Sequence, residues 1–153
     1  MASEPPPSID QECVEGYVFH RPPLQILLFR RPPDRGNIWA PVSGKVEATD
    51  SDYPSALRRE LLEETGFDQV NRVFPLDWEV IFPMEGQRWR LHAFGVELHK
   101  VSVPTLSSEH AEFAWLSADD ASRRLHYPDN REALARLLAF LDREGPPKAP
   151  PTV

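Results

Sequence analysis

The sequence predicts a single α+β domain built as a sandwich, with a mixed β-sheet flanked by helices. The first observation is the order of its segments, which runs from short apolar stretches to one helical segment, further apolar stretches and a final helical segment. That order is typical of a sheet with helices packed against it. The second is size and composition, since 153 residues with 41% apolar and 27% charged side chains suit one folded domain.

Proline marks the ends of this domain. Proline residues gather at both ends of the chain, as Pro5, Pro6, Pro7, Pro146, Pro147, Pro150 and Pro151. Such clusters favour extended chain over packed structure. We therefore expect Pro-rich tails over residues 1–11 and 145–153, and the folded domain over residues 12–144.

The first part of the domain contains three expected strands. Residues 13–19 and 24–29 are rich in β-branched and aromatic side chains and flank a turn-forming segment with two prolines. Residues 38–46 form the third strand, in which Gly44 indicates that the backbone passes another group closely. Cys13 is the only cysteine, which excludes an intramolecular disulfide, and we expect it to be a buried apolar side chain.

A helix, a hairpin and a second helix follow. Pro54 and Gly66 suit the first turn and the end of a helix over residues 54–65. Residues 70–83 and 87–99 are apolar-alternating stretches separated by Met84, Glu85 and Gly86, which predicts a hairpin. A short strand over residues 112–116 and a helix over residues 130–141, with leucines at helical spacing, complete the domain.

Three carboxylates share one arc of the central helix. With 100° per residue and Leu57 at zero, Glu63, Glu60 and Glu64 lie at about 240°, 300° and 340°. This arc adjoins the apolar stripe, so Glu60 and Glu64 are expected at the rim of the core. Like charges at this spacing are unfavourable, and an oxygen-rich set of this kind suits Mg²⁺ or Mn²⁺. The alternative is a solvated acidic face with an Arg59–Glu63 ion pair.

The net charge limits the partners. A charge of −7 and a pI near 5.2 argue against binding to duplex nucleic acid, which requires a basic face. No stretch approaches the roughly 20 apolar residues of a membrane span, and the first residues lack the apolar core of a signal peptide. We therefore expect a cytoplasmic protein without duplex nucleic acid or membrane as a partner. The oligomeric state is not encoded in any motif that we recognise.

The residues around the central helix resemble the signature of the Nudix family. That pattern is Gly, five residues, Glu, seven residues, Arg-Glu, an aliphatic residue, any residue, Glu-Glu, any residue, Gly and an apolar residue. The chain has Gly44, five residues, Asp50, eight residues and then Arg59-Glu60-Leu61-Leu62-Glu63-Glu64-Thr65-Gly66-Phe67. It departs from the pattern by Asp50 in place of Glu and by one extra loop residue before Arg59. Residues 27–31, 39–44 and 109–116 extend the resemblance over nearly the whole folded body.

Nudix proteins hydrolyse a nucleoside diphosphate linked to another group, using a divalent metal and an attacking water. The resemblance therefore implies an α/β/α sandwich with Mg²⁺, or Mn²⁺, as the cofactor. It implies that the metal is held by the backbone carbonyl of Gly44 and by the carboxylates of Glu60, Glu63 and Glu64. Metal charge is needed because a polyphosphate is otherwise repelled by a protein of charge −7.

The resemblance also implies roles in catalysis. Arg59 is expected to orient a carboxylate and to keep it ionised. The acceptor of the water proton is expected to be Glu60 or a later loop glutamate, for which Glu109 is the first candidate and Glu112 the next. Glu60, Glu63, Arg59 and Glu109 are thus the expected catalytic residues.

The substrate is a small nucleotide or pterin polyphosphate by the same resemblance. Arg30 and Arg31 at a strand end are expected to bind phosphate, and Trp39 to stack on a base or pterin ring, with exposed arginines and a core tryptophan as alternatives. The histidines show no metal-ligand spacing and receive no role. We favour dihydroneopterin triphosphate, a nucleoside triphosphate or a dinucleoside polyphosphate over a sugar nucleotide. The alternative function is a non-catalytic nucleotide-binding or regulatory module on the same fold.

Overall fold

One mixed sheet organises the domain. The computed structural model describes residues 8–146, so residues 1–7 and 147–153, which make up most of the predicted tails, lie outside the described residues. The strands are β1 (Gln11–His20), β2 (Gln25–Arg30), β3 (Trp39–Ala40), β4 (Val42–Lys45), β5 (Val70–Met84), β6 (Gln87–Leu98) and β7 (Glu112–Leu116). Their order is β3-β2-β1-β6-β5, with β4 paired to β1 and β7 paired to β2. β1 and β6 are parallel and the other pairs are antiparallel.

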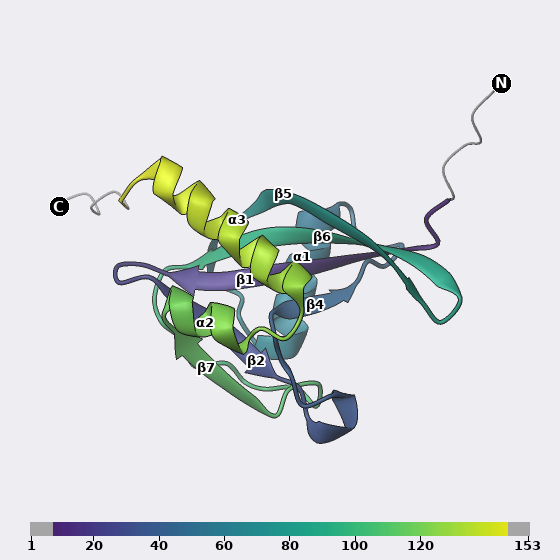
Figure 1. Cartoon of the computed structure of the whole chain (residues 1–153), viewed down its shortest axis with the longest axis horizontal. Coiled ribbons are helices and arrows are strands. Elements are labelled where there is room, and N and C mark those ends of the chain that lie inside the picture. The colour runs from purple at the N-terminus through teal and green to yellow at the C-terminus, as the bar shows by residue number, and fades with distance from the viewer. Residues whose placement is uncertain (1–7, 147–153) are drawn as a thin grey trace.

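Strand β1 changes its partner along its length. Its first half pairs with β4, from Cys13 opposite Lys45 to Gly16 opposite Val42, and its last residues pair with β2. On the other edge, β6 runs parallel to nearly the whole strand. β5 and β6 continue beyond the other strands as a long two-stranded hairpin (Figure 1). β4, the first half of β1 and this hairpin therefore lie at one end of the sheet.

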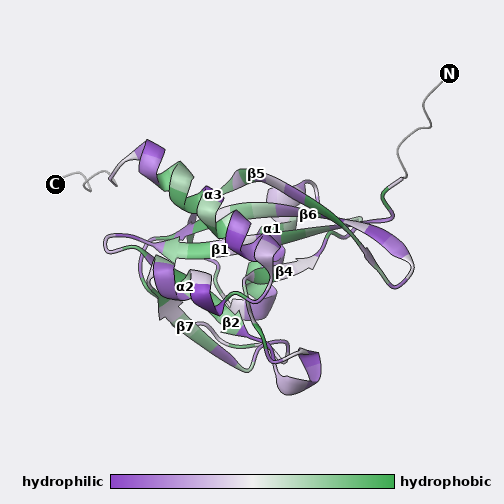
Figure 2. Ribbon diagram, in the orientation of Figure 1, coloured by the Kyte–Doolittle hydropathy of each residue, from purple (hydrophilic) through white to green (hydrophobic). Residues whose placement is uncertain are grey.

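Helices cover both faces of the sheet. α1 (Tyr53–Thr65) packs on one face, whereas α2 (Ala118–Arg124) and α3 (Pro128–Glu144) pack on the other (Figure 1). Alternate residues of β1 supply two cores, because Tyr17 and Phe19 face α3 while Val14 and Val18 face α1. Figure 2 shows green, apolar colour along the central strands and recurring purple, polar bands on α3. The predicted α/β/α sandwich is confirmed.

The helix that carries the carboxylates has well-defined ends. The side chain of Asp52 caps its first turn by accepting a hydrogen bond from the backbone of Ser55 at 2.7 Å. Gly66 ends it with a φ of 77°, a left-handed conformation that favours glycine. Leu57 and Leu61 are fully buried in the core between α1 and the sheet. These anchors fix the rotation of α1 about its axis, and this rotation decides where its carboxylates point.

The predicted elements are confirmed with two corrections. The strand expected over residues 38–46 is interrupted at Pro41, which has no N–H to donate to a strand ladder. There the chain passes from β3, which pairs with β2, to β4, which pairs with β1. α2 and a short 3-10 turn (Pro33–Arg35) are additional elements. α2 buries only Ala121 among its seven residues, so it lacks the apolar periodicity that predicts a helix.

Candidate active site

The carboxylate of Glu60 packs directly against the backbone of Gly44. A Cβ atom at position 44 would lie 2.0 Å from Cδ of Glu60, far inside contact distance. The prediction that the backbone passes another group closely at Gly44 is therefore confirmed. β4 and α1 bring a backbone segment without a side chain and a helix carboxylate together at the expected metal site.

Arg59 connects the loop before α1 to the carboxylates of the helix. Its Nε and Nη2 atoms donate to the two oxygens of Asp50, each at 2.9 Å. Its Nη1 atom donates to Glu60 at 2.9 Å and to Glu63 at 3.3 Å. Two parallel bonds between a guanidinium and a carboxylate are a strong and well-oriented pair, and the hydrogen bonds from Arg59 hold the pKa of Asp50 below its usual value. Asp50 replaces the glutamate of the signature, and one extra residue precedes Arg59. Arg59 nevertheless has a carboxylate partner that it binds through two hydrogen bonds.

The three carboxylates of α1 differ in exposure. Glu60 and Glu64 are 9% and 4% exposed, as expected for the rim of the core, whereas the side chain of Glu63 is 57% exposed. Burial raises the pKa of Glu60 despite the hydrogen bond from Arg59. The Arg59–Glu63 ion pair of the alternative reading is present, but a solvated face does not describe the two buried carboxylates.

The loop between β6 and β7 is docked against the end of α1. The backbone N–H of Thr105 donates to the carbonyl of Thr65 at 2.9 Å, and the N–H of Ala111 donates to the carbonyl of Arg30 at 2.8 Å. These two contacts fix both ends of the segment between them. That segment contains the loop glutamate that was expected to complete the site.

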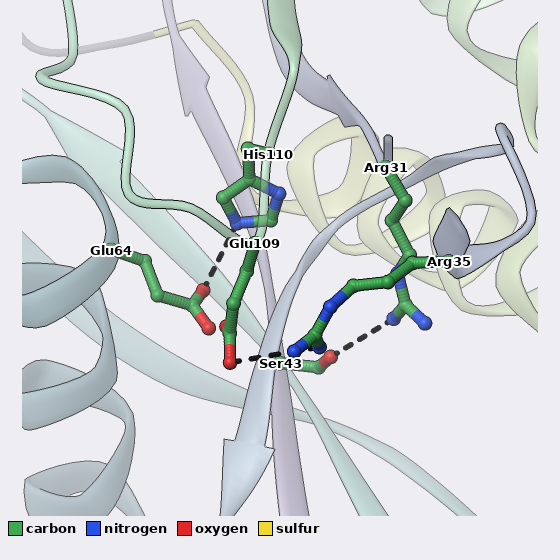
Figure 3. Close-up of a pocket in the computed structure, with 6 residues that line it drawn as sticks. All are labelled: Arg31, Arg35, Ser43, Glu64, Glu109 and His110. Carbon is green, nitrogen blue, oxygen red and sulfur yellow. Dashed lines mark hydrogen bonds and ion pairs between the residues drawn. The ribbon is translucent and has the colours of Figure 1, made fainter. Parts of the chain in front are cut away.

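Glu64, Glu109 and His110 form an acidic cluster with one imidazole. A ligand atom from each residue lies within 4.8 Å of the others, and Nε2 of His110 is 3.3 Å from Oε2 of Glu64 (Figure 3). Burial and the adjacent Glu109 raise the pKa of Glu64 to about 10, because two neighbouring carboxylates resist ionising together. Burial lowers the pKa of His110, whose Nδ1 is buried and has no partner among residues 8–146. Oxygen and imidazole ligands of this kind suit a divalent metal.

Basic side chains face this cluster across a small pocket of about 190 Å³ (Figure 3). Nη2 of Arg31 lies 3.4 Å from the hydroxyl of Ser43, and a guanidinium nitrogen of Arg35 lies 3.9 Å from Glu109. The lining residues are Arg31, Arg35, Ser43, Glu64, Glu109 and His110. Carboxylates on one side and guanidinium groups on the other can hold a metal together with a phosphate group.

A larger pocket of about 620 Å³ adjoins the small one, because Arg31 and Ser43 line both. Its walls are mainly apolar side chains of the β5–β6 hairpin, namely Val80, Phe82, Met84, Trp89 and Leu91. β1 and the start of α3 add polar groups, including Glu15 and Asn130. Together the two pockets offer a charged end and a mainly apolar end, and an apolar pocket with a few polar groups is typical of a small-molecule site.

The structure brings only one of the three expected substrate-binding residues to these pockets, namely Arg31. Arg30 instead pairs with Glu112 at 3.0 Å and donates to Asn37 at 2.6 Å. Trp39 packs against the core, with the guanidinium of Arg124 4.9 Å from its ring centre. Arg30, Trp39 and Glu112 line neither pocket.

For several residues that line the two pockets, the sequence predicted no role. His110 lacks ligand spacing with other histidines, but its position next to Glu109 was a usable signal. Glu15 shares one strand face with Cys13, Tyr17 and Phe19, so the period of two predicts a buried carboxylate there. Ser43 and Arg35 carried no comparable signal.

One protein family matches most of the chain. The NUDIX domain family model matches residues 16–137, and the chain belongs to this family. The dihydroneopterin triphosphate diphosphatase of Haemophilus influenzae is 29% identical over 132 residues, which cover 78% of this chain and 82% of that protein. An octanoyltransferase of Myxococcus xanthus is 34% identical over 122 residues, or 77% of this chain, and the chain spans 33% of that relative's length.

Solved structures show the same fold. A NUDIX hydrolase structure from Listeria monocytogenes has a TM-score of 0.76 with 25% identity, covering 86% of this chain and 94% of that one. The E. coli dihydroneopterin triphosphate pyrophosphohydrolase has a TM-score of 0.74 with 20% identity, covering 88% and 100%. A C. elegans Ap4A hydrolase has a TM-score of 0.73 with 20% identity, covering 87% and 98%. None of the helices in the described part of the chain is long and apolar enough to cross a membrane.

Proposed function

We propose that the chain is a Mg²⁺-dependent hydrolase that cleaves a pyrophosphate linkage in a nucleoside or pterin triphosphate, or in a dinucleoside polyphosphate. The observation that carries this proposal is the cluster of Glu64, Glu109 and His110 with Arg31 facing it across the small pocket, while Glu60 of the same helix packs against the backbone of Gly44. Acidic and basic groups on two sides of one pocket suit a metal-bound polyphosphate. The names of the related dihydroneopterin triphosphate diphosphatase and Ap4A hydrolase support these substrate classes.

The donor set of the site suits Mg²⁺ or Mn²⁺. Burial and the neighbouring Glu109 raise the pKa of Glu64, and Glu60 fills the space that a side chain at position 44 would occupy. We assign the metal to the carbonyl of Gly44 and to the carboxylates of Glu60, Glu63 and Glu64. When bound, the metal supplies positive charge to the phosphoryl oxygens and lowers the pKa of a water molecule.

Side chains of the chain perform the remaining steps in this proposal. Arg59 holds Glu60 in position through its 2.9 Å hydrogen bond. Glu109, which stands in the pocket on a docked loop, accepts the proton of the attacking water, with Glu60 as the alternative acceptor. Arg31 donates hydrogen bonds to phosphate oxygens and orients the substrate.

A phosphate-release screen tests the proposal. Purified protein is incubated with nucleoside triphosphates, dihydroneopterin triphosphate and dinucleoside polyphosphates, with MgCl₂ or with EDTA. We expect release only with the metal, and hydrolysis in ¹⁸O-labelled water to place the label on a phosphate product. Saturable nucleotide binding without any release would instead favour the non-catalytic module. The domain boundaries at residues 12–144 and a cytoplasmic location remain part of this proposal.

A further inference from the structure

A buried carboxylate lines the larger pocket. Glu15 lies in β1 and is only 3% exposed. The hydroxyl of Tyr17 donates to one of its oxygens at 2.8 Å, and the side-chain amide of Asn130 donates to the other at 3.2 Å. The same amide donates to the Tyr17 hydroxyl at 3.1 Å. Because both neighbours donate, Glu15 is held as an acceptor, and each of its oxygens keeps further lone-pair capacity.

No ion pair explains the burial of Glu15. None of the ion pairs within residues 8–146 includes it. Among the residues that line the same pocket, Asp129 adds negative charge nearby and Arg31 adds positive charge. A buried carboxylate without a directly paired cation is costly, and hydrogen bonds from Tyr17 and Asn130 offset only part of that cost. Its position at the wall of a ligand-sized pocket indicates a ligand that donates hydrogen bonds.

The rest of the pocket suits a flat ring. Its volume of about 620 Å³ lies within the usual range of small-molecule sites. The β5–β6 hairpin contributes the rings of Phe82 and Trp89, and the segment before α3 contributes Tyr127. Aromatic walls favour stacking with a planar heterocycle. The aromatic walls therefore favour a planar ligand, and the carboxylate of Glu15 favours hydrogen-bond donors on the edge of that ligand.

Charge sets the direction in which a nucleotide binds. Asp129 lines only the larger pocket and repels phosphate, whereas Arg31 lines both pockets and attracts it. Glu15 stands opposite Ser43, a residue of the shared border, in the β1–β4 pair. The border leads to the cluster of Glu64 and Glu109. A nucleotide with its phosphates in the small pocket therefore has its ring in the larger pocket, beside Glu15.

We infer that Glu15 selects a ring with a 2-amino-4-oxopyrimidine edge, which guanine and pterin share. This edge presents a ring N–H and an exocyclic amino group side by side, and two parallel donors match the two oxygens of one carboxylate. Adenine and uracil do not offer this pair of donors. Tyr17 and Asn130 act as positioning residues for Glu15. The inference rests on the proposed function, because it takes the small pocket as the phosphate end.

Equilibrium binding to the whole chain tests this inference without turnover. The probes are GMP, inosine 5′-monophosphate, which lacks only the 2-amino group, and AMP, with Mg²⁺ present. Because burial raises the pKa of Glu15 to about 7, binding is measured at about pH 8.5, where the carboxylate is ionised. We expect GMP to bind about 10- to 100-fold more tightly than inosine 5′-monophosphate, since one hydrogen bond to a charged acceptor is lost. Equal affinities would overturn the inference.

Two variants separate recognition from structure. Glu15→Gln should abolish most of the preference for GMP over AMP while the variant remains folded at the pH of the binding measurement. Glu79→Gln is the matched control, because this exposed carboxylate lies near His92 on the α1 face of β5 and lines neither pocket. A Glu15→Gln variant that loses affinity for all probes equally would make Glu15 a structural link between β1 and α3 and overturn the inference. If Glu15→Gln does not fold, the inference is tested by the relative affinities of the parent protein for GMP and inosine 5′-monophosphate.

The outcomes distinguish this inference from the proposed function. A preference for GMP without phosphate release from any substrate of the screen would overturn the hydrolase proposal and leave base recognition standing. Metal-dependent release without a preference among the three monophosphates would support the hydrolase proposal and overturn the inference about Glu15.

Discussion

Arg59 holds both carboxylate oxygens of Asp50 at 2.9 Å, while another nitrogen of the same guanidinium holds Glu60 at 2.9 Å. Asp50 itself lines neither pocket. It also accepts a hydrogen bond from the backbone N–H of Glu47 at 2.8 Å, which ties the loop to the same carboxylate. Asp50 therefore acts, through Arg59, on the carboxylate of Glu60, which we assign to the metal.

The first prediction concerns the contacts of Arg59 with Asp50 and Glu60. Asp50→Asn should lower turnover in the phosphate-release assay by about 10- to 100-fold, because partners that orient a metal ligand typically contribute that much. Asp52→Asn is the control, since asparagine caps a helix as well as aspartate does. Equal turnover of Asp50→Asn and the parent would show that Arg59 needs no partner in the loop.

The second prediction concerns the buried carboxylates of α1. Glu60→Gln and Glu64→Gln should each lower turnover by about 10² to 10⁴, with far smaller changes in substrate binding. The reason is that both carboxylates face the proposed metal. Steady-state kinetics measure the effect, with Glu79→Gln as the exposed control. Either variant within about threefold of the parent would contradict the assignment.

The third prediction uses the contact between Gly44 and Glu60. Gly44→Ala should destabilise the protein by about 1–3 kcal/mol, because the new Cβ overlaps the carboxylate 2.0 Å away. Removing the obstructing side chain should relieve this strain, so Gly44→Ala should cost much less in a Glu60→Ala background. Urea unfolding of the four proteins of this double-mutant cycle measures the coupling. Additive effects would mean that the backbone at Gly44 moves away without cost.

The fourth prediction concerns the metal and needs no substrate. MgCl₂ should raise the melting temperature, and above Kd the gain in stability should grow by about 1.4 kcal/mol for each tenfold rise in Mg²⁺ concentration. Glu64→Gln removes one of the crowded carboxylates, so the metal-free variant should be at least as stable as the parent while responding less to Mg²⁺. NaCl of equal ionic strength is the control, since an acidic face without a site responds only to screening. Equal responses of both proteins to both salts would exclude the site.

The fifth prediction concerns the pH dependence of stability. Burial raises the pKa of Glu15 from 4.5 to about 7, with Tyr17 and Asn130 in contact and with Asp129 and Arg31 nearby. The folded protein therefore retains a proton that the unfolded chain releases above about pH 4.5, and stability falls as pH rises toward 7. Relative to Glu15→Gln, the parent should lose up to about 3 kcal/mol over this interval. Urea unfolding from pH 4.5 to 8 measures the difference, and a constant difference would mean that Glu15 titrates normally.

The sequence by itself determined most of the elements and part of the site. The apolar alternation of the strands, Pro54 and Gly66 at the ends of the helix and the spacing of Glu60, Glu63 and Glu64 are local features. Their consequences follow from backbone geometry within a few residues. The interruption of the predicted strand at Pro41 and the short α2 were missed, because an exchange of strand partners and a helix with one buried residue leave little local pattern.

Only the tertiary structure decided which distant residues meet. Glu109 and His110 reach Glu64 because backbone hydrogen bonds at Thr105 and Ala111 dock their loop. Arg31 enters both pockets while its neighbour Arg30 pairs with Glu112, since adjacent residues at a strand end point to different sides. Glu15 and Asn130 are 115 positions apart in the sequence and meet only when α3 packs on β1. Burial, and with it the pKa values of Glu15 and Glu64, is a property of this packing and not of any local pattern.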